Sequence, residues 1–320
     1  MRVLHIFDGR RIEPHLQIDY ILGLQKYCDV FIYGPSEHEI NGSVLSPIKY
    51  DADLMYTKIV DLLKPDMILL PEYAILKMLP NYKSIGDVVN TKKVSIEVDS
   101  YSYDAINAQL IELGIDFIIS RGPYQKGYFA APYTWMPWSV PDEICVDQVN
   151  YHNRFNKIVF VGGGRDSQNR FYDTRRMAIR LLEVSNMLDY FSQLDYKKYL
   201  DVITKYKCGL SCSLSSLQMA PAKVWEYMAR GCLVLCPWFH GSESIFKDEK
   251  CYVQYESDCS NLFDVVNYVV DNEAICEQIA INGWKTVCDK HTHTKRVKEM
   301  YDVLESVLNG NEVVDKWSVD

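Results

Sequence analysis

The residues best placed to do chemistry lie in the short segment Pro221 to Leu235, where a helix is expected to lead into a buried strand. Pro221 favours the first turn of a helix, where its missing N–H costs nothing, and Gly231 suits the end. Lys223 and Glu226 share one face of that helix because of their spacing. A helix N-terminus carries partial positive charge, which together with the lysine suits a diphosphate. Glu226 can accept paired hydrogen bonds from ribose hydroxyls, although an ordinary surface ion pair is the simpler alternative.

A second segment with phosphate-binding character joins the expected strand Lys157–Val161 to the glycines Gly162–Gly164 and to Arg165. Glycine lets a backbone approach a phosphate closely, because it has no side chain to intervene. The spacing is not that of a dinucleotide-binding fingerprint, which needs a third glycine three residues further on. A plain tight turn is therefore an equal alternative.

The elements that must position these residues alternate along the chain, with short apolar runs separated by stretches of helical spacing. This alternation predicts an α/β protein in which helices cover parallel sheets. In the first half we expect strands at Arg2–Phe7, Asp29–Tyr33, Met67–Leu70, Val94–Val98 and Ile115–Ser120, and helices at Leu16–Tyr27, Asp53–Leu63 and Ala105–Leu113. In the second half we expect strands at Lys157–Val161, Cys208–Cys212 and Cys232–Cys236, and helices at Thr174–Val184, Tyr196–Tyr206, Ala222–Arg230, Leu262–Val270, Glu273–Asn282 and His293–Leu308.

A proline-rich stretch, Ala131–Pro141, interrupts the alternation. Its three prolines cannot continue a helix or lie in a central strand, so it marks a domain boundary. We therefore predict two domains, residues 1–145 and 146–320, and the last helix could cross back to the first. Open parallel sheets bind ligands at the carboxyl ends of their strands. Two such domains facing each other would form a deep cleft, and Gly9, just after the first strand, would allow a ligand to approach there unless it serves only as a turn.

The composition excludes several classes of protein. The chain has 320 residues and a net charge of −9, with no basic block, which disfavours a large nucleic-acid footprint and a polybasic mode of membrane binding. No apolar run approaches the roughly 18 residues that span a bilayer. The N-terminus does not have the pattern of a secretory signal, so we predict a cytoplasmic protein.

The ten cysteines do not suggest a disulfide framework or a metal site. Several lie in apolar runs such as Cys232–Cys236, where free cysteine acts as a small hydrophobic residue. Cys208 and Cys212 have no paired histidines at zinc-binding spacing. We therefore expect reduced thiols and no metal.

The segment Pro221–Leu235 resembles the donor-site motif of group 1 glycosyltransferases with the GT-B fold, whose consensus is roughly Pro-x-Lys-x-x-Glu-Tyr-Met-Ala-x-Gly-x-x-Val. The resemblance implies two Rossmann-like domains facing across a cleft, the first binding an acceptor and the second a nucleotide-sugar donor. It is specific over this segment, and elsewhere it rests on the domain pattern. The matching residues are Pro221, Lys223, Glu226, Tyr227, Met228, Ala229, Gly231 and Val234.

The resemblance assigns roles within the donor site. It implies that Glu226 binds the ribose, that Lys223 lies close to the phosphates, and that the glycine loop offers Gly163 and Arg165 as phosphate contacts. Gln218 stands where many retaining members have a glutamate that contacts the donor sugar. An amide can still bond a sugar hydroxyl, and spore-coat-type relatives also depart from the two-glutamate pattern. The change leaves the stereochemical outcome open.

For catalysis, the resemblance points to the ends of first-domain strands. Asp99, after the strand Val94–Val98, is the candidate for general base, and Glu72, after Met67–Leu70, is its rival. We expect a metal-independent glycosyltransferase with no cofactor besides its donor substrate. A nucleotide-sugar epimerase or a phosphorylase on the same fold, and a non-catalytic nucleotide-sugar-binding protein, remain alternatives. The acceptor (a glycan, a protein or a modified nucleic-acid base), the nucleotide, the sugar and the oligomeric state are left open.

Overall fold

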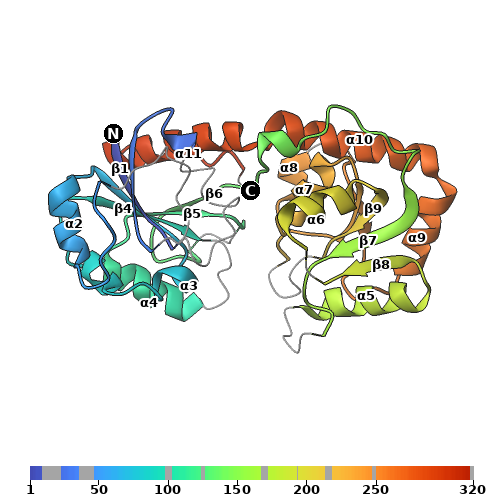
Figure 1. Cartoon of the computed structure of the whole chain (residues 1–320), viewed down its shortest axis with the longest axis horizontal. Helices are drawn as coiled ribbons and strands as arrows, with labels where there is room; N and C mark the ends of the chain where they lie inside the picture. The colour runs from blue at the N-terminus through green and yellow to red at the C-terminus, as the bar shows by residue number, and fades with distance from the viewer. Residues whose placement is uncertain are drawn as a thin grey trace. The chain divides into compact units, whose positions relative to one another are not determined.

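The computed structural model describes residues 1–8, 23–35, 47–97, 103–123, 127–166, 172–192, 194–212, 218–246 and 250–317 (Figure 1). Two of the predicted site residues, Gly9 and Asp99, lie outside these described residues. The others, together with most of the predicted strands, lie within them.

The chain forms two compact units. Unit 1 contains Met1–Pro137 and His293–Ser318, and unit 2 contains Trp138–Thr292. The division falls at Pro137, not at the predicted residue 145, because the next stretch is bonded to unit 2: the N–H of Val140 donates to the carbonyl of His291 (3.0 Å), and that of Val146 donates to Ala229 (3.1 Å). The last helix belongs to unit 1, which is the crossing back that the sequence analysis allowed for the domain of residues 146–320.

Unit 1 is built on a six-stranded, all-parallel sheet with the order β2-β1-β3-β4-β5-β6 (Figure 1). The inner strand β3 is a continuous apolar run, Met-Ile-Leu-Leu, as expected when helices cover both faces of a parallel sheet. The last strand was not predicted, but it lies at the edge of the sheet, where flanking prolines are tolerated. The strands are β1 (Arg2–Ile6), β2 (Asp29–Tyr33), β3 (Met67–Leu70), β4 (Lys92–Glu97), β5 (Phe117–Ser120) and β6 (Tyr133–Trp135).

Alternate residues of these strands enter two separate apolar layers. Leu4 and Ile68 contribute to one layer, whereas Val3 and Met67 contribute to the other. The helix α11 covers the second layer with Val297, Met300, Leu304 and Val307, whose spacing forms one apolar stripe, and this packing explains why it belongs to unit 1. The helices are α2 (Tyr56–Leu63), α3 (Tyr73–Leu76), α4 (Tyr103–Leu113) and α11 (His293–Asn309), with a 3₁₀ turn η1 (Tyr82–Ile85).

Unit 2 contains a five-stranded parallel sheet with the order β11-β10-β9-β7-β8. The sequence analysis missed both edge strands, because β8 is half-exposed along most of its length and β11 has only three residues. Neither gives the long apolar run that revealed the central strands. The strands are β7 (Phe155–Val161), β8 (Leu188–Phe191), β9 (Tyr206–Leu210), β10 (Leu233–Pro237) and β11 (Val253–Tyr255).

The helix α10 continues well past its predicted end at Asn282, through Gly283. A Cβ atom at Gly283 would lie 2.8 Å from the carbonyl oxygen of Cys251, so this glycine permits close packing and does not end the helix. The apolar faces of α5, α9 and α10 share a core with the sheet. The helices of unit 2 are α5 (Asp173–Val184), α6 (Tyr196–Ile203), α7 (Lys223–Ala229), α8 (Ser242–Phe246), α9 (Leu262–Asp271) and α10 (Glu273–Lys290), with a 3₁₀ turn η2 (Asp142–Ile144).

Candidate functional site

The strand order identifies one place in unit 2 where a ligand fits the fold. From β7 the chain runs to β8 on one side, and it then returns to β9 on the other side of β7. In doubly wound sheets, ligands bind outside the carboxyl ends of the strands at such a reversal. The glycine loop Gly162–Gly164 follows β7 at that edge, so the topology singles out the surroundings of this loop.

Lys223 reaches this loop from the start of α7. Its Nζ donates a hydrogen bond to the carbonyl of Val161, the last residue of β7, and lies 4.4 Å from the centroid of the Phe160 ring. A Cβ atom at Gly162 would lie only 2.7 Å from this Nζ, and Gly162 has φ +135°. The lysine thus fills space that only a glycine leaves empty. The structure therefore brings Lys223 and the glycine loop into contact.

Arg175, in the first turn of α5, is a second cation at the loop. Its Nη1 donates to the carbonyl of Gly163 (3.3 Å), and its guanidinium lies over the rings of Phe160 (5.7 Å) and Tyr172 (4.4 Å). Its Nε is buried and has no hydrogen-bond acceptor within the described part of the chain. Gly164, with φ +108°, leaves room for its Cδ, which would lie 2.8 Å from a Cβ atom there. The sequence analysis did not identify Arg175. Its position next to the predicted helix start at Thr174 could have indicated an anion-binding role.

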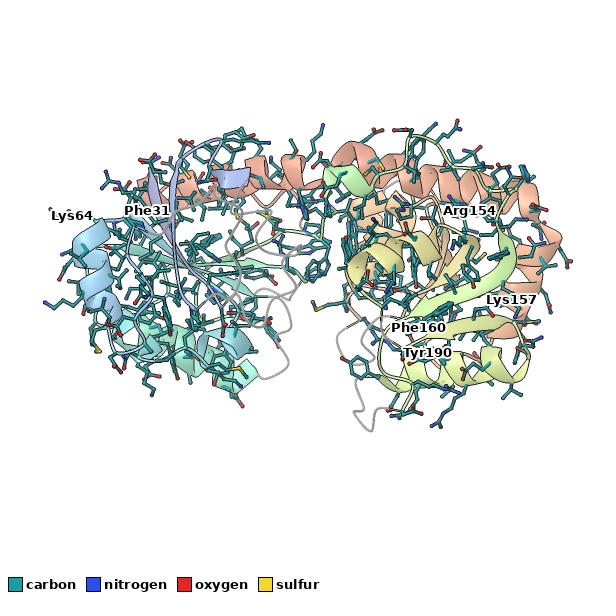
Figure 2. All side chains as sticks on the ribbon, in the orientation of Figure 1. Phe31, Lys64, Arg154, Lys157, Phe160 and Tyr190 are labelled. Atoms are coloured by element: carbon teal, nitrogen blue, oxygen red, sulfur yellow. The ribbon has the colours of Figure 1, made fainter. Side chains whose placement is uncertain are left out.

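Arg165, the predicted phosphate contact, directly follows the loop and is paired with a carboxylate. Its Nη2 pairs with Oε2 of Glu183 at 3.2 Å, and its guanidinium lies 5.3 Å from the centroid of the Tyr190 ring. Tyr190 in turn stacks on Phe160 of the neighbouring strand, with ring centroids 6.0 Å apart (Figure 2). Arg165 is therefore held on the β8 side of the loop by its own carboxylate partner.

Glu226 is almost fully buried in α7, with 8% of its surface exposed. The hydroxyl of Tyr199, from α6, donates a hydrogen bond to its Oε2 at 2.7 Å. Burial, followed by the charge of Glu226, raises the pKa of Tyr199 well above its usual value, so the phenol keeps its proton and remains a donor. The carboxylate is consequently held in one orientation by a residue that the sequence gave no reason to single out.

Gln218, predicted to contact the donor sugar, has a left-handed backbone with φ 46°. Residues other than glycine and asparagine seldom adopt this conformation, and such strain is concentrated at functional sites. Its carbonyl accepts a hydrogen bond from the N–H of His240 at 2.8 Å, which helps to hold the backbone in place. Gln218 immediately precedes the segment that leads into α7.

In unit 1, two carboxyl groups lie at the carboxyl ends of neighbouring strands. Glu72 follows β3, and Glu97 ends β4. Glu97 accepts hydrogen bonds from the hydroxyl of Ser95 (2.7 Å) and from the N–H of Tyr73 (3.5 Å). Its burial, reinforced by the nearby charge of Glu72, raises its pKa to about 8. Sequence reasoning passed over Glu97 as part of an apolar strand, although an acidic residue in such a run was a visible signal.

Within the described residues, no group of three or more His, Cys, Asp or Glu side chains is placed to hold a metal ion. No helix in the same part of the chain is long and apolar enough to span a membrane.

Comparisons with known proteins agree with this arrangement. The family model described as glycosyl transferase-like matches residues 153–302, which include the glycine loop and α7. Sucrose-phosphate synthase from Thermosynechococcus elongatus has a similar structure, with a TM-score of 0.68 and 10% identity over 97% of this chain and 100% of its own. No curated protein matches the sequence.

Two further solved structures are similar at the same low identity, which shows likeness of fold. HepE from Anabaena, in complex with UDP and glucose, has a TM-score of 0.65 and 10% identity, covering 96% of this chain and 100% of its own. A proposed UDP-N-acetylglucosamine 2-epimerase from Listeria monocytogenes has a TM-score of 0.56 and 10% identity, covering 100% and 99%. Residues 153–302 therefore match the glycosyl transferase-like family model, and the chain has the two-domain GT-B fold, in agreement with the resemblance seen in the segment Pro221–Leu235.

Proposed function

We propose that this protein is a glycosyltransferase whose nucleotide-sugar donor binds to unit 2, at the carboxyl edge of β7. The observation that carries the proposal is the convergence of Lys223 and Arg175 on the loop Gly162–Gly164 and on the ring of Phe160. Two cations beside a glycine loop suit a diphosphate, because the loop leaves its backbone accessible and the cations supply charge.

The reaction breaks the bond between the sugar and the diphosphate, so negative charge develops on the leaving phosphate. Lys223 and Arg175 are placed by fixed contacts and need little rearrangement to stabilise this charge. In this proposal the two side chains perform the task that a metal ion performs in other transferases, and the donor is the only small molecule required besides the acceptor. Arg165 contributes less, because it is paired with Glu183.

The ribose of the donor binds to Glu226 in this proposal. The hydroxyl of Tyr199 orients the carboxylate through its Oε2, which reduces the entropy that a flexible side chain would lose on binding. Gln218 bonds a hydroxyl of the donor sugar through its amide, and its strained backbone fixes the position of the side chain. Gly163, whose Cβ position is open, allows the backbone to approach the phosphates.

We further propose that unit 1 binds the acceptor and supplies the general base. Asp99 remains the first candidate and Glu72 the second, because each comes two residues after the end of a strand in the sequence. Glu97 is less suited to this role, because it is buried and holds its proton up to a pH of about 8. Gly9, after β1, would leave room for the acceptor or for the sugar being transferred.

A nucleotide-sugar epimerase is the second candidate function. Its support is the similar structure of the proposed 2-epimerase from Listeria monocytogenes. One fold carries both reactions, so only the site and its products distinguish them.

The first test is ligand binding. We would measure the melting temperature of the protein with UDP, GDP, ADP and CDP and with their common sugars, starting with UDP because HepE is seen with UDP and glucose. A ligand at a hundred times its dissociation constant should stabilise the protein by about 2.7 kcal/mol. We expect Glu226→Gln and Lys223→Met to lose the stabilisation, whereas Lys198→Met, which changes an exposed lysine paired with Asp195, should retain it.

The second test separates the two functions. With the donor that binds, a transferase releases the free nucleoside diphosphate. This release is slow when the sugar is transferred to water and rapid once an acceptor is present. An epimerase instead yields the isomeric nucleotide sugar. If no nucleotide stabilises the folded wild-type protein, the assigned donor site is wrong, and the proposed transferase and epimerase activities are both rejected.

A further inference from the structure

The first stretch of unit 2, residues 138–146, lies along the C-terminal end of α10, and we refer to it as the crossing segment. At its beginning, Val140 donates a backbone hydrogen bond to His291 (3.0 Å) and forms an isolated parallel bridge with Thr292. At its end, the indole Nε1 of Trp284 donates to the carbonyl of Val146 (2.9 Å). The crossing segment is therefore attached to the end of α10 at two points.

Two cysteines lie between these attachments. Cys145 directly precedes Val146, and Cys288 lies one helical turn beyond Trp284, on the same face of α10. Their thiols lie close enough for each to affect the ionisation of the other, and both side chains are half-buried. Of the other cysteines only Cys28 is also partly exposed, and it lies in unit 1.

The charges around the pair distinguish the two thiols. Nη1 of Arg230 donates to the carbonyl of Ile144 (3.1 Å), so a guanidinium lies beside the peptide bond that leads into Cys145. The interaction with Cys288, aided by the charge of Arg230, lowers the pKa of Cys145, although burial and the charges of Asp142 and Glu143 oppose the change. The same interaction, then burial and the charges of Cys145, Asp289 and Asp142, raises the pKa of Cys288. Cys145 is therefore the thiol that ionises first, and a thiolate is the reactive form.

We propose that Cys145 and Cys288 form an oxidation site, which a peroxide converts into a disulfide. The thiolate of Cys145 attacks one peroxide oxygen, the O–O bond breaks, and the departing hydroxide takes up a proton to become water. The resulting sulfenic acid is attacked by the sulfur of Cys288, whose proton leaves with the departing hydroxyl as a second water. Two thiols and one hydrogen peroxide thus give one disulfide and two waters, and the two electrons come from the sulfurs.

The disulfide would have a structural consequence that is independent of the proposed transferase function. Cys145 follows the point where the chain enters unit 2, and Cys288 precedes the point where it leaves. The chain segment that enters unit 2 and the segment that leaves it are held together by noncovalent bonds in the reduced protein. A disulfide between the two cysteines would join these segments covalently.

The test uses the full-length protein. After treatment with hydrogen peroxide, the remaining thiols are blocked with iodoacetamide, and the unreduced protein is digested with trypsin for mass analysis. We expect a cross-linked pair of peptides containing Cys145 and Cys288, the loss of two titratable thiols per chain, and recovery of both with dithiothreitol. Unchanged thiols, or a disulfide that joins other cysteines or two chains, would overturn the proposal.

Single variants test the order of the steps. In Cys288→Ser, the sulfenic acid should persist on Cys145 and be trapped by a 1,3-diketone probe, whereas Cys145→Ser should trap little. The control Cys28→Ser should form the disulfide as the wild type does. If the probe labels Cys288 in Cys145→Ser as fast as it labels Cys145 in Cys288→Ser, the assignment of Cys145 as the attacking thiol is wrong. The mapping of the wild-type protein decides the pairing even if a variant does not fold.

Discussion

The Nζ atom of Lys223 occupies the space that a side chain at Gly162 would need, with only 2.7 Å between it and an added Cβ atom. The same amine bonds the carbonyl of Val161, so the glycine, the strand end and the helix α7 form one connected group. A residue from the predicted phosphate loop and a residue from the predicted donor motif are thus mutually dependent, which makes the loop sensitive to single substitutions.

Gly162→Ala should therefore disturb the site directly. The new methyl group must displace Lys223, and φ +135° is unfavourable for alanine. We expect a loss of about 1–3 kcal/mol in the free energy of unfolding and at least tenfold weaker nucleotide binding. Calorimetric binding and urea denaturation measure the two effects.

Gly163→Ala is the matched control for that change. A Cβ atom at Gly163 has no neighbour within 4 Å, so stability should change by less than about 0.5 kcal/mol. Equal losses of stability in both variants would show that the space filled by Lys223 is not what matters at Gly162.

Substitution of the two arginines should separate their roles. Arg175 bonds the glycine loop, whereas Arg165 is paired with Glu183. We expect Arg175→Gln to weaken binding of a nucleoside diphosphate by roughly ten- to a hundredfold, the range of one charge-assisted hydrogen bond, and Arg165→Gln to weaken it less than threefold. Titration calorimetry with the same ligand compares them, and the reverse ranking would restore Arg165 as the phosphate contact.

Tyr199→Phe should weaken donor binding without removing any atom that touches the donor in our proposal. The variant loses the hydroxyl that holds Oε2 of Glu226. We expect about 1–2 kcal/mol lower stability and several-fold weaker binding of nucleosides that carry a ribose. Binding of inorganic diphosphate, which has no ribose, should change little.

Tyr206→Phe provides the comparison for Tyr199→Phe. Its hydroxyl also donates to a carboxylate, that of Asp189, at 2.8 Å, but from the start of β9. Tyr206→Phe should lower the free energy of unfolding by no more than Tyr199→Phe does, and it should leave nucleotide binding unchanged. If both variants bind nucleotide equally well, the orientation of Glu226 by Tyr199 has no role in recognition.

The buried carboxyl of Glu97 predicts a dependence of stability on pH. Its pKa is raised from 4.5 to about 8 on folding, so between these values the folded protein holds a proton that the unfolded chain releases. This group therefore makes stability fall as the pH rises from about 4.5 to about 8, with a slope of at most about 1.4 kcal/mol per pH unit. In Glu97→Gln this contribution is absent, so the stability of the variant relative to the wild type should increase as the pH rises.

Urea denaturation at pH 5 and pH 8.5 tests the expectation for Glu97. The exposed Glu112, which pairs with Lys83, offers the control Glu112→Gln. The difference in unfolding free energy between Glu97→Gln and the wild type should grow with pH, whereas that for Glu112→Gln should stay nearly constant. Parallel curves for all three proteins would mean that Glu97 ionises normally in the folded state.

Central strands such as β3 and β10 could be predicted because they are continuous apolar runs, the pattern of parallel strands that are buried on both faces. The edge strands β6, β8 and β11 are short or half-exposed, so their pairing depends on neighbours that no local pattern reveals. The length of α10 could not be predicted either. Gly283 suggested a helix end, but it permits close packing against the carbonyl of Cys251, and the helix continues.

The site divides in a similar way. Lys223 and Glu226 could be predicted because the helix and its spacing are local properties of one segment. Arg175 and Tyr199 come from other helices and reach the site only through the fold, so their partners cannot be inferred from spacing. Arg165 shows the converse: its position next to the loop was correctly read, but the direction of its side chain is set by Glu183.

The packing of α11 in unit 1 also affects how the protein is made. The apolar layer that contains Val3 and Met67 is completed by Val297, Met300 and Leu304. All of unit 2 is synthesised between these two groups of residues. On the ribosome, unit 2 can therefore fold first, while the apolar surface that α11 covers on the earlier sheet waits for α11 to emerge. We expect a chain that stops after Thr292 to have a folded unit 2 and an exposed, aggregation-prone apolar surface on unit 1. Correct folding of unit 1 therefore depends on synthesis of the last helix.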